Sequence, residues 1–152
     1  INNIQFKFIQ KTNEKIEKGE CTLVFPSKLK CDYDDKNKKE LIVNKKMIAI
    51  TQKRYGKTIF YPLSKSAFIN ILSKNELKKI INENETIIDD YINIVFSDKN
   101  ESKTLIRFNK KDFLLAGWVS SDQYNNQITF DIEINSINQM IDKKIFTLPS
   151  RN

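Results

Sequence analysis

The sequence predicts a mainly β fold, an unclosed antiparallel β-barrel (half-barrel) with a short helical lid. Apolar and polar residues alternate with a period of two along most of the chain, as in strands with one buried face. The strand-like segments number about ten, more than one flat sheet usually holds. Such a meander tends to curl, which also hides its edges. Only the stretch after Leu63 switches to helical spacing, and a helix there could cover the mouth.

The first half of the chain reads as consecutive strands joined by polar turns. Ile4, Phe6 and Phe8 alternate with polar residues, and 19–33 reads as two strands joined at a bend centred on Pro26. Further strands are predicted at 40–43, 47–51 and 58–63. Because proline cannot donate a ladder hydrogen bond, Pro62 indicates an edge or an end of the sheet.

The hairpin around Pro26 contains both cysteines. Cys21 and Cys31 lie five residues either side of the proline, so symmetric pairing places both sulfurs on one face. Leu23, Phe25, Leu29 and Tyr33 share that face. Two interpretations stay open: a disulfide, which indicates an oxidising compartment, or two buried thiols. A metal site would need about four ligands, and neither histidine nor a third cysteine is present.

The second half begins with the helical segment and returns to strands. Ser64 and Ser66 are N-cap candidates, and Phe68, Ile71 and Leu72 have helical spacing. Asn75 is expected to cap a further turn through Leu77, and 80–88 fits helix or strand. Strands are predicted at 91–96, 102–108, 113–121 and 127–134. Asn138 is expected to cap a helical turn at 139–143, and a closing strand is predicted at 145–148 before Pro149.

Composition indicates one soluble domain over residues 1–152 and excludes several kinds of chemistry. No apolar run approaches the roughly 20 residues that span a membrane. Without histidine a Ser-His nucleophile is impossible, and three separated glycines make no phosphate-binding loop. The acidic clusters at 32–35 and 89–90 read as solvated turns. We therefore expect no enzyme activity, no cofactor and no metal.

The net charge of +7 is unevenly placed. Residues 1–79 contain 18 Lys and Arg against 8 Asp and Glu, whereas residues 80–152 contain 8 against 11. A basic half could face nucleic acid, anionic headgroups or an acidic partner. Nucleic acid is disfavoured because only Arg54, Arg107 and Arg151 could supply the bidentate contacts that read guanine. The preferred interpretation is that the lysines solvate the outer face and protect sheet edges.

Aromatic residues recur on the predicted strands, and two interpretations of them remain open. They form an ordinary core, or some of them line an apolar cavity; the pattern does not separate the two. The set comprises Phe6, Phe8, Phe25, Phe60, Tyr61, Phe68, Phe108, Trp118, Phe130 and Phe146.

The order of several landmarks resembles one known family. The landmarks are Phe8-Ile9-Gln10, Gly19, Pro26 with Tyr33, Pro62-Leu63 before the apolar helix, Asp122 with Asn125-Asn126, and 134–138 followed by Ile141, Phe146 and Pro149. In order and spacing they resemble the LolA family of periplasmic outer-membrane lipoprotein carriers, along nearly the whole chain.

The resemblance implies a half-barrel whose apolar interior accepts the acyl chains of lipoproteins. It implies an inner-membrane ABC transporter as donor and an outer-membrane acceptor as recipient, with no bond made or broken. The residues expected to form the cavity and the lid are Phe8, Leu23, Phe25, Leu29, Tyr61, Leu63, Phe68, Ile71, Leu72 and Phe130.

The sequence departs from the family pattern at two places. The family's N-terminal helix, expected before Ile4, is missing from these residues, and Phe25 stands where many carriers have an arginine that helps hold the lid closed. We expect a monomeric, periplasmic carrier that binds no nucleic acid, in which Phe25 latches the lid by an aromatic contact. The alternatives are an acceptor or sensor of the same fold, and a basic β-barrel binding single-stranded nucleic acid.

Overall fold

The computed structural model describes residues 2–65, 74–97, 103–121 and 124–150, and its strands form one antiparallel sheet of eleven. The strands are β1 (Asn3–Thr12), β2 (Lys15–Val24), β3 (Lys28–Tyr33), β4 (Lys39–Asn44), β5 (Met47–Gln52), β6 (Lys57–Pro62), β7 (Thr86–Ile88), β8 (Tyr91–Ser97), β9 (Lys103–Asn109), β10 (Leu115–Ser121) and β11 (Gln127–Ile137). The described helices are α1 (Lys74–Glu83) and two 3₁₀ turns, η1 (Leu63–Lys65) and η3 (Lys143–Phe146).

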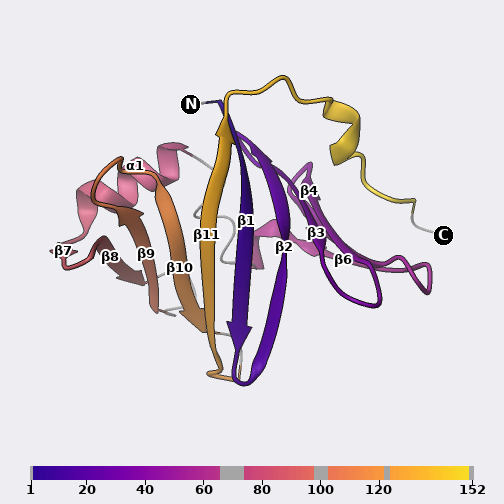
Figure 1. Cartoon of the computed structure of the whole chain (residues 1–152), viewed down its shortest axis with the longest axis horizontal. Coiled ribbons are helices and arrows are strands. Elements are labelled where there is room, and N and C mark those ends of the chain that lie inside the picture. The colour runs from indigo at the N-terminus through magenta and orange to yellow at the C-terminus, as the bar shows by residue number, and fades with distance from the viewer. Residues whose placement is uncertain (1, 66–73, 98–102, 122–123, 151–152) are drawn as a thin grey trace.

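The sheet order is β6-β5-β4-β3-β2-β1-β11-β10-β9-β8-β7, and it does not close. Figure 1 shows β1 and β11 at the centre, with the first half of the chain fanning to one side and the second half to the other. We call β2–β6 the first wing and β7–β10 the second wing. The predicted unclosed half-barrel is confirmed. Pro62 ends β6, which is an edge strand as its proline indicated.

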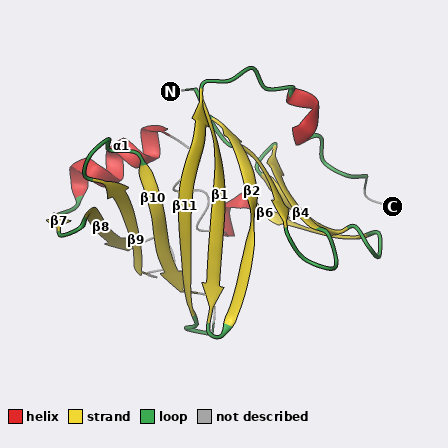
Figure 2. Cartoon of the chain, viewed as in Figure 1, coloured by secondary structure: helices red, strands yellow, loops and turns green. Residues whose placement is uncertain are grey.

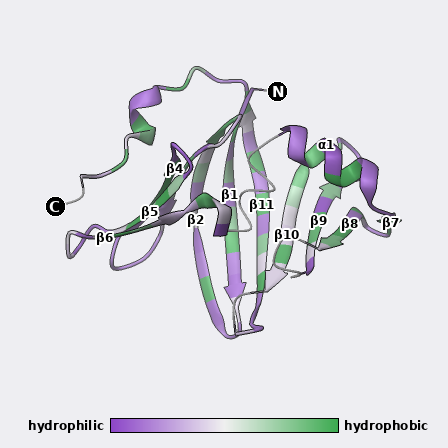
Figure 3. Cartoon of the chain, turned by 180° about the vertical axis from the view of Figure 1, so that it is seen from behind, coloured by the Kyte–Doolittle hydropathy of each residue, from purple (hydrophilic) through white to green (hydrophobic). Residues whose placement is uncertain are grey.

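One face of the sheet, called here the inner face, holds the main hydrophobic core. Alternate residues of every strand except β7 contribute to it, and Figure 3 shows hydrophobic and hydrophilic segments alternating along the strands. The core also includes Leu63 of η1 and Ile80 of α1, so short helical elements pack on this face. The remaining members are Ile4, Phe6, Phe8, Cys21, Leu23, Leu29, Cys31, Tyr33, Leu41, Val43, Ile48, Ile94, Phe96, Ile106, Trp118 and Phe130.

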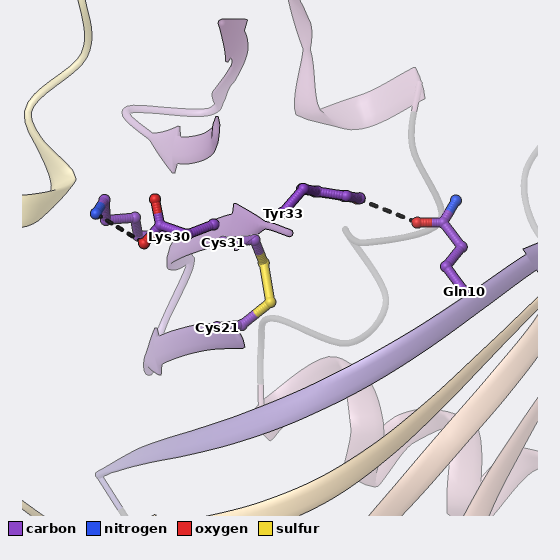
Figure 4. Close-up of a disulfide and its surroundings, with 6 residues drawn as sticks. Gln10, Cys21, Lys30, Cys31 and Tyr33 are labelled. Atoms are coloured by element: carbon purple, nitrogen blue, oxygen red, sulfur yellow. Dashed lines mark hydrogen bonds and ion pairs between the residues drawn. A yellow bond between two sulfur atoms is a disulfide. The ribbon is translucent and has the colours of Figure 1, made fainter. Parts of the chain in front are cut away.

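The hairpin around Pro26 pairs in the symmetric register that its sequence predicted. Cys21 lies opposite Cys31 and Leu23 opposite Leu29, and the two cysteines form a disulfide with their Cα atoms 4.1 Å apart. This separation is typical of the closer, non-hydrogen-bonded type of antiparallel pair. Figure 4 shows the bond joining β2 to β3. The disulfide interpretation is confirmed, and the interpretation as two free thiols is excluded.

A smaller apolar cluster lies on the opposite, outer face of the first wing. Ile42 of β4 and its partner Ala49 of β5 are buried although they alternate with core residues. The 3₁₀ turn η3 packs against β3 and β4, and its Phe146 is fully buried. The carbonyl of Phe146 accepts a hydrogen bond from the Asn44 side chain, 2.9 Å away. The segment 138–150 after β11 therefore runs over the outer face of the first wing, and we call it the strap.

Two predictions for this C-terminal segment are wrong. Residues 139–143 form no helical turn, because the Asn138 carboxamide instead accepts hydrogen bonds from the backbone of Asn2 and Asn3. Residues 145–148 form no strand, because this segment lies on the outer face against β3 and β4, away from the unpaired edges of β6 and β7. The 3₁₀ turn η3 begins later, capped by Asp142, whose carboxylate accepts from the Lys144 amide.

The region after β6 differs from the expectation in extent. The predicted turn at Asn75 is part of a ten-residue helix, α1, and the ambiguous stretch 80–88 divides between the end of α1 and β7. Figure 2 shows α1 beside the second wing, and it contacts β8. The predicted lid residues Phe68, Ile71 and Leu72 lie outside the described residues.

Candidate functional site

The inner face is the candidate ligand-binding site, and it brings together most residues assigned to the cavity. Phe8, Leu23, Leu29, Leu63 and Phe130 are at most 5% exposed and belong to one continuous cluster. Phe25 and Tyr61 are half-buried and pack against it. In this structure the apolar surface of these residues is largely buried. A ligand would have to displace elements that cover it, such as η1 and α1.

A row of stacked rings runs across the centre of this face. The Phe130 ring stacks on Phe8 with centroids 4.7 Å apart and on Trp118 at 4.4 Å. Tyr33 meets Phe8 edge to face at 4.9 Å. These geometries are the favourable ones for aromatic pairs. The row spans β3, β1, β11 and β10, so it ties the two wings together across the centre of the sheet.

Gly19 explains how the ring of Phe8 reaches Tyr33 across the intervening strand β2. Gly19 pairs with Phe8 on one side and Tyr33 on the other. A Cβ at residue 19 would lie 2.7 Å from two Phe8 ring carbons and 2.3 Å from the Asp32 carbonyl oxygen. Only a residue without a side chain leaves this space to the aromatic ring. The Phe8 ring lies over the backbone of Gly19, an arrangement known from other sheets in which an aromatic residue faces a strand glycine.

The aromatic row ends in a polar rim at Tyr33. Its hydroxyl donates to the Gln10 side chain at 3.1 Å (Figure 4), and the Lys39 ammonium lies 4.0 Å from its ring centroid. Lys39 also pairs with Glu17. Burial, and next the nearby charge of Glu17, hold the pKa of Tyr33 well above its ordinary value. Tyr33 therefore stays neutral under physiological conditions and acts as a hydrogen-bond donor.

Helix α1 covers part of the inner face and touches the hairpin turn. Ile80 is buried in the core and Leu77 packs against it, so α1 presents its apolar side to the sheet. At its first residue, the Lys74 ammonium lies 5.3 Å from the Phe25 ring centroid, a cation–π distance. This contact joins the start of a helix to the position where the family's latch is expected.

Sequence analysis missed the part of this face contributed by the second wing. Ile94, Phe96 and Ile106 are buried in the same cluster but were not assigned to the cavity. Strand β8 is apolar on both faces, since Tyr91 and Val95 lie on the face opposite Ile94 and Phe96, and this concealed which alternate residues point inward. The sequence of β9 did contain a signal, because Ile106 and Phe108 alternate with Arg107. This alternation indicates that Ile106 points inward, and the structure buries it.

A groove of about 720 Å³ lies across β11, β1, β2 and β3. Most of its lining residues alternate with those of the aromatic row and belong to the outer face, and most of these are charged: Lys7, Ile9, Lys18, Glu20, Asp32, Asp131 and Glu133. The lining also includes Phe8, Gly19, Tyr33, Asp34 and Ile132. Because charged groups resist transfer to an apolar environment, this groove is unsuited to an acyl chain, and the inner face remains the candidate.

The sequence matches a family model over residues 1–149, that of the outer membrane lipoprotein carrier protein LolA. No curated protein matched the sequence.

Solved structures with a similar fold cover 95% of the chain at 8–9% identity. MucB in complex with MucA(peri) has a TM-score of 0.52, and the chain covers 53% of its length. A domain from Vibrio parahaemolyticus, described as an outer membrane lipoprotein-sorting protein, has a TM-score of 0.51 with 88% of its length covered. A LolA superfamily protein from Nitrosomonas europaea reaches 0.49 with 89% covered. At this identity the first two support the fold alone.

Proposed function

The chain belongs to the LolA family of outer membrane lipoprotein carrier proteins, and from this premise we propose that it carries lipoproteins through the periplasm. Their acyl chains bind on the inner face, and the protein shuttles them from the inner to the outer membrane. Its partners are the acylated lipoproteins, an inner-membrane ABC transporter that loads it and an outer-membrane acceptor. No covalent step is involved.

The observation that carries this proposal is the continuous apolar inner face, which spans both wings and is covered by short elements. The packed row of Tyr33, Phe8, Phe130 and Trp118 gives it an apolar floor. A linear acyl chain, which has no polar groups to satisfy, needs only such a floor and a cover that can move. The described part of that cover is α1.

Competition between α1 and the acyl chain makes release possible. Each buried methylene contributes about 0.8 kcal/mol, so a chain bound to a rigid open face would be held too tightly to pass on. Leu77 and Ile80 cover part of the face in this state. A ligand that displaces them exchanges one apolar contact for another, and the net affinity falls toward a value that permits transfer.

The disulfide supports a periplasmic location, because structural disulfides persist in oxidising compartments. Both cysteines are buried in the core, at 3% and 1% exposure. No helix in the described part of the chain is long and apolar enough to cross a membrane.

The direct test is to purify the protein natively from the periplasm and identify bound molecules by mass spectrometry. We expect acylated peptides or intact lipoproteins. In solution, an N-terminally acylated peptide should displace a fluorescent hydrophobic probe from the protein, whereas the same peptide without its acyl chains should not. Equal displacement by both peptides would contradict binding through the acyl chains.

Two measurements separate this function from the alternatives. An acceptor or sensor would bind acylated peptide but would not release it to membranes bearing an outer-membrane acceptor, whereas a carrier transfers it. A nucleic-acid-binding barrel would bind single-stranded oligonucleotides with an affinity that falls steeply with salt.

A further inference from the structure

Five lysines gather at one end of the first wing, and we call this group the lysine end. Lys28 begins β3, Lys45 and Lys46 form the turn between β4 and β5, Lys65 ends η1 and Lys74 begins α1. Lys28 is half-exposed, and the other four are exposed. In sequence they are spread over nearly fifty residues, so only the fold brings them together.

The strand register places these lysines side by side. The pairs that fix this arrangement are Val24 with Lys28, Leu29 with Val43, Asn44 with Met47, and Met47 with Pro62. The Leu63 amide donates to the Lys46 carbonyl at 2.9 Å, which joins η1 to the β4–β5 turn. The contact of Lys74 with the Phe25 ring brings the start of α1 to the neighbouring turn.

Acidic residues are scarce around the lysine end. Residues 41–75 contain no Asp or Glu, and among the five lysines only Lys74 has an acidic residue within three positions in sequence, Glu76 in the first turn of α1. None of the five lysines forms an ion pair with another described residue. The strap adds exposed Lys143 and Lys144 against Asp142. At the same end of the second wing the charges are mixed, because the turns contain Asp89, Asp90 and Asp112 together with Lys110 and Lys111.

Resting on the carrier function proposed above, we propose that the lysine end docks the protein on a membrane surface rich in anionic phospholipid headgroups. Clustered lysines beside a membrane are attracted to such lipids, each contributing independently of exact geometry. The lysine end also adjoins Leu63 and α1, which pack on the inner face. Docking there brings the cover of the acyl-chain site to the membrane.

The chemistry of the cluster favours a lipid surface over a nucleic acid. Its cations are all lysines, compact point charges without the planar fork that holds phosphate bidentately. The aromatic ring in contact with one of these lysines, Phe25, is half-buried and already lies under Lys74, so it offers no stacking platform for bases. A spread of point charges over several turns matches a fluid surface in which headgroups rearrange.

Vesicle flotation tests the proposal. The protein is mixed with vesicles of phosphatidylglycerol and phosphatidylcholine, or of phosphatidylcholine alone, at low salt and at about 0.15 M salt. We expect binding to the anionic vesicles only, weakened by salt. The variant Lys28→Gln, Lys45→Gln, Lys46→Gln, Lys65→Gln should lower partition at least about tenfold. Lys74 is left intact because it touches Phe25.

A matched control removes the same charge at the other end of the sheet, through Lys11→Gln, Lys36→Gln, Lys38→Gln, Lys57→Gln, all exposed lysines. It should stay within about twofold of the wild type if position rather than net charge decides binding. Equal loss in both variants, equal binding to neutral vesicles, or salt-sensitive binding of an oligonucleotide without vesicle binding would each overturn the proposal.

The acyl-probe assay separates this proposal from the carrier function. Both lysine variants should bind a fluorescent acyl probe in vesicle-free solution as the wild type does, because none of the substituted lysines is buried or belongs to the apolar cluster of the inner face. A wild type that binds anionic vesicles but no acylated peptide would contradict the carrier function, and docking would then stand by itself.

Discussion

At the residue scale, Phe25 bears on how α1 is kept on the inner face. It stands where the family resemblance leads one to expect an arginine. An arginine at this position would hold its partner through directed hydrogen bonds. Phe25 instead offers an aromatic face, and the partner observed is the ammonium of Lys74 at the start of α1. A cation–π contact at a partly exposed site contributes roughly 0.5–1 kcal/mol, so the latch is weak and suited to opening.

We expect Phe25→Ala to raise the affinity of the ligand-free protein for a fluorescent hydrophobic probe about threefold, as the loss of one weak contact implies. The physical reason is that α1 would be displaced more easily from the inner face. Fluorescence titration measures the effect. Phe113→Ala, which removes a ring that is 70% exposed, is the matched control and should change nothing. Unchanged affinity in Phe25→Ala would remove the latch role.

Tyr33 makes stability depend on alkaline pH. Its pKa is raised in the folded protein, first by burial and then by the charge of Glu17. Stability from the neutral phenol is therefore complete below about pH 10, the pKa in the unfolded chain, and is lost as pH rises from there toward the folded pKa. Between about pH 9 and pH 11 the free energy of unfolding should fall more steeply for the wild type than for Tyr33→Phe.

Urea unfolding gives the free energy of unfolding of both proteins across this pH range. The variant also lacks the hydrogen bond to Gln10, so the difference between the two proteins at neutral pH serves as the baseline. Parallel curves for the two proteins would show that Tyr33 is not protected from ionisation in the native state.

At the element scale, period-two alternation predicted the strands because one buried face is a local property of each strand. The symmetric hairpin followed from the spacing about Pro26, and both were confirmed. The strap could not be predicted in this way. The stretch 145–148 has strand-like composition, yet its place behind β3 and β4 is decided by long-range contacts of Phe146 and Asn44.

The candidate site was also predicted in part. The family resemblance assigned Phe8, Leu23, Leu29, Leu63 and Phe130 to the cavity, and the structure buries these five in one apolar cluster. The contribution of β8 was missed because apolar residues occupy both of its faces. The role of Gly19 could not be read from sequence, since it depends on the Phe8 ring crossing β2.

The strap should stabilise the fold without taking part in binding. Phe146→Ala removes a fully buried ring from the outer-face cluster and should lower the free energy of unfolding by about 3–5 kcal/mol. Met140→Ala, a fully exposed position in the same segment, is the control and should be nearly neutral. At temperatures where Phe146→Ala is folded, its probe affinity should equal that of the wild type. A large change in affinity would show that the two faces are coupled.

At the scale of the whole molecule, the uneven charge of the sequence becomes a spatial one. The two halves of the chain form different wings, so the excess of lysine lies on one side. The sequence favoured the interpretation that the lysines solvate the surface. This interpretation fits the lysines that form ion pairs with acidic side chains, such as Lys39 with Glu17 and Lys53 with Glu40. The lysines of the lysine end, by contrast, form no ion pair with another described residue.

The disulfide should contribute to global stability without specifying the fold. Replacing both cysteines, Cys21→Ala with Cys31→Ala, should lower the free energy of unfolding by about 2–3 kcal/mol, measured by urea unfolding. The register is expected to survive because Leu23 still faces Leu29. Reductant should destabilise the wild type and leave the double variant unchanged. Two free thiols in the unfolded, unreduced protein would contradict the bond.

The central pairing of β1 with β11 has a consequence for how the chain reaches this structure. Asn3–Thr12 and Gln127–Ile137 are neighbours in the sheet although more than a hundred residues separate them. Pairings between such distant segments form slowly, because a long loop must close before any contact rewards it. During synthesis, β1 can pair with β2 at once, but its other edge stays unpaired until β11 is made. In that interval the open edge and the uncovered side chains of Ile4, Phe6 and Phe8 favour aggregation, as transiently exposed strand edges and apolar surface do in general.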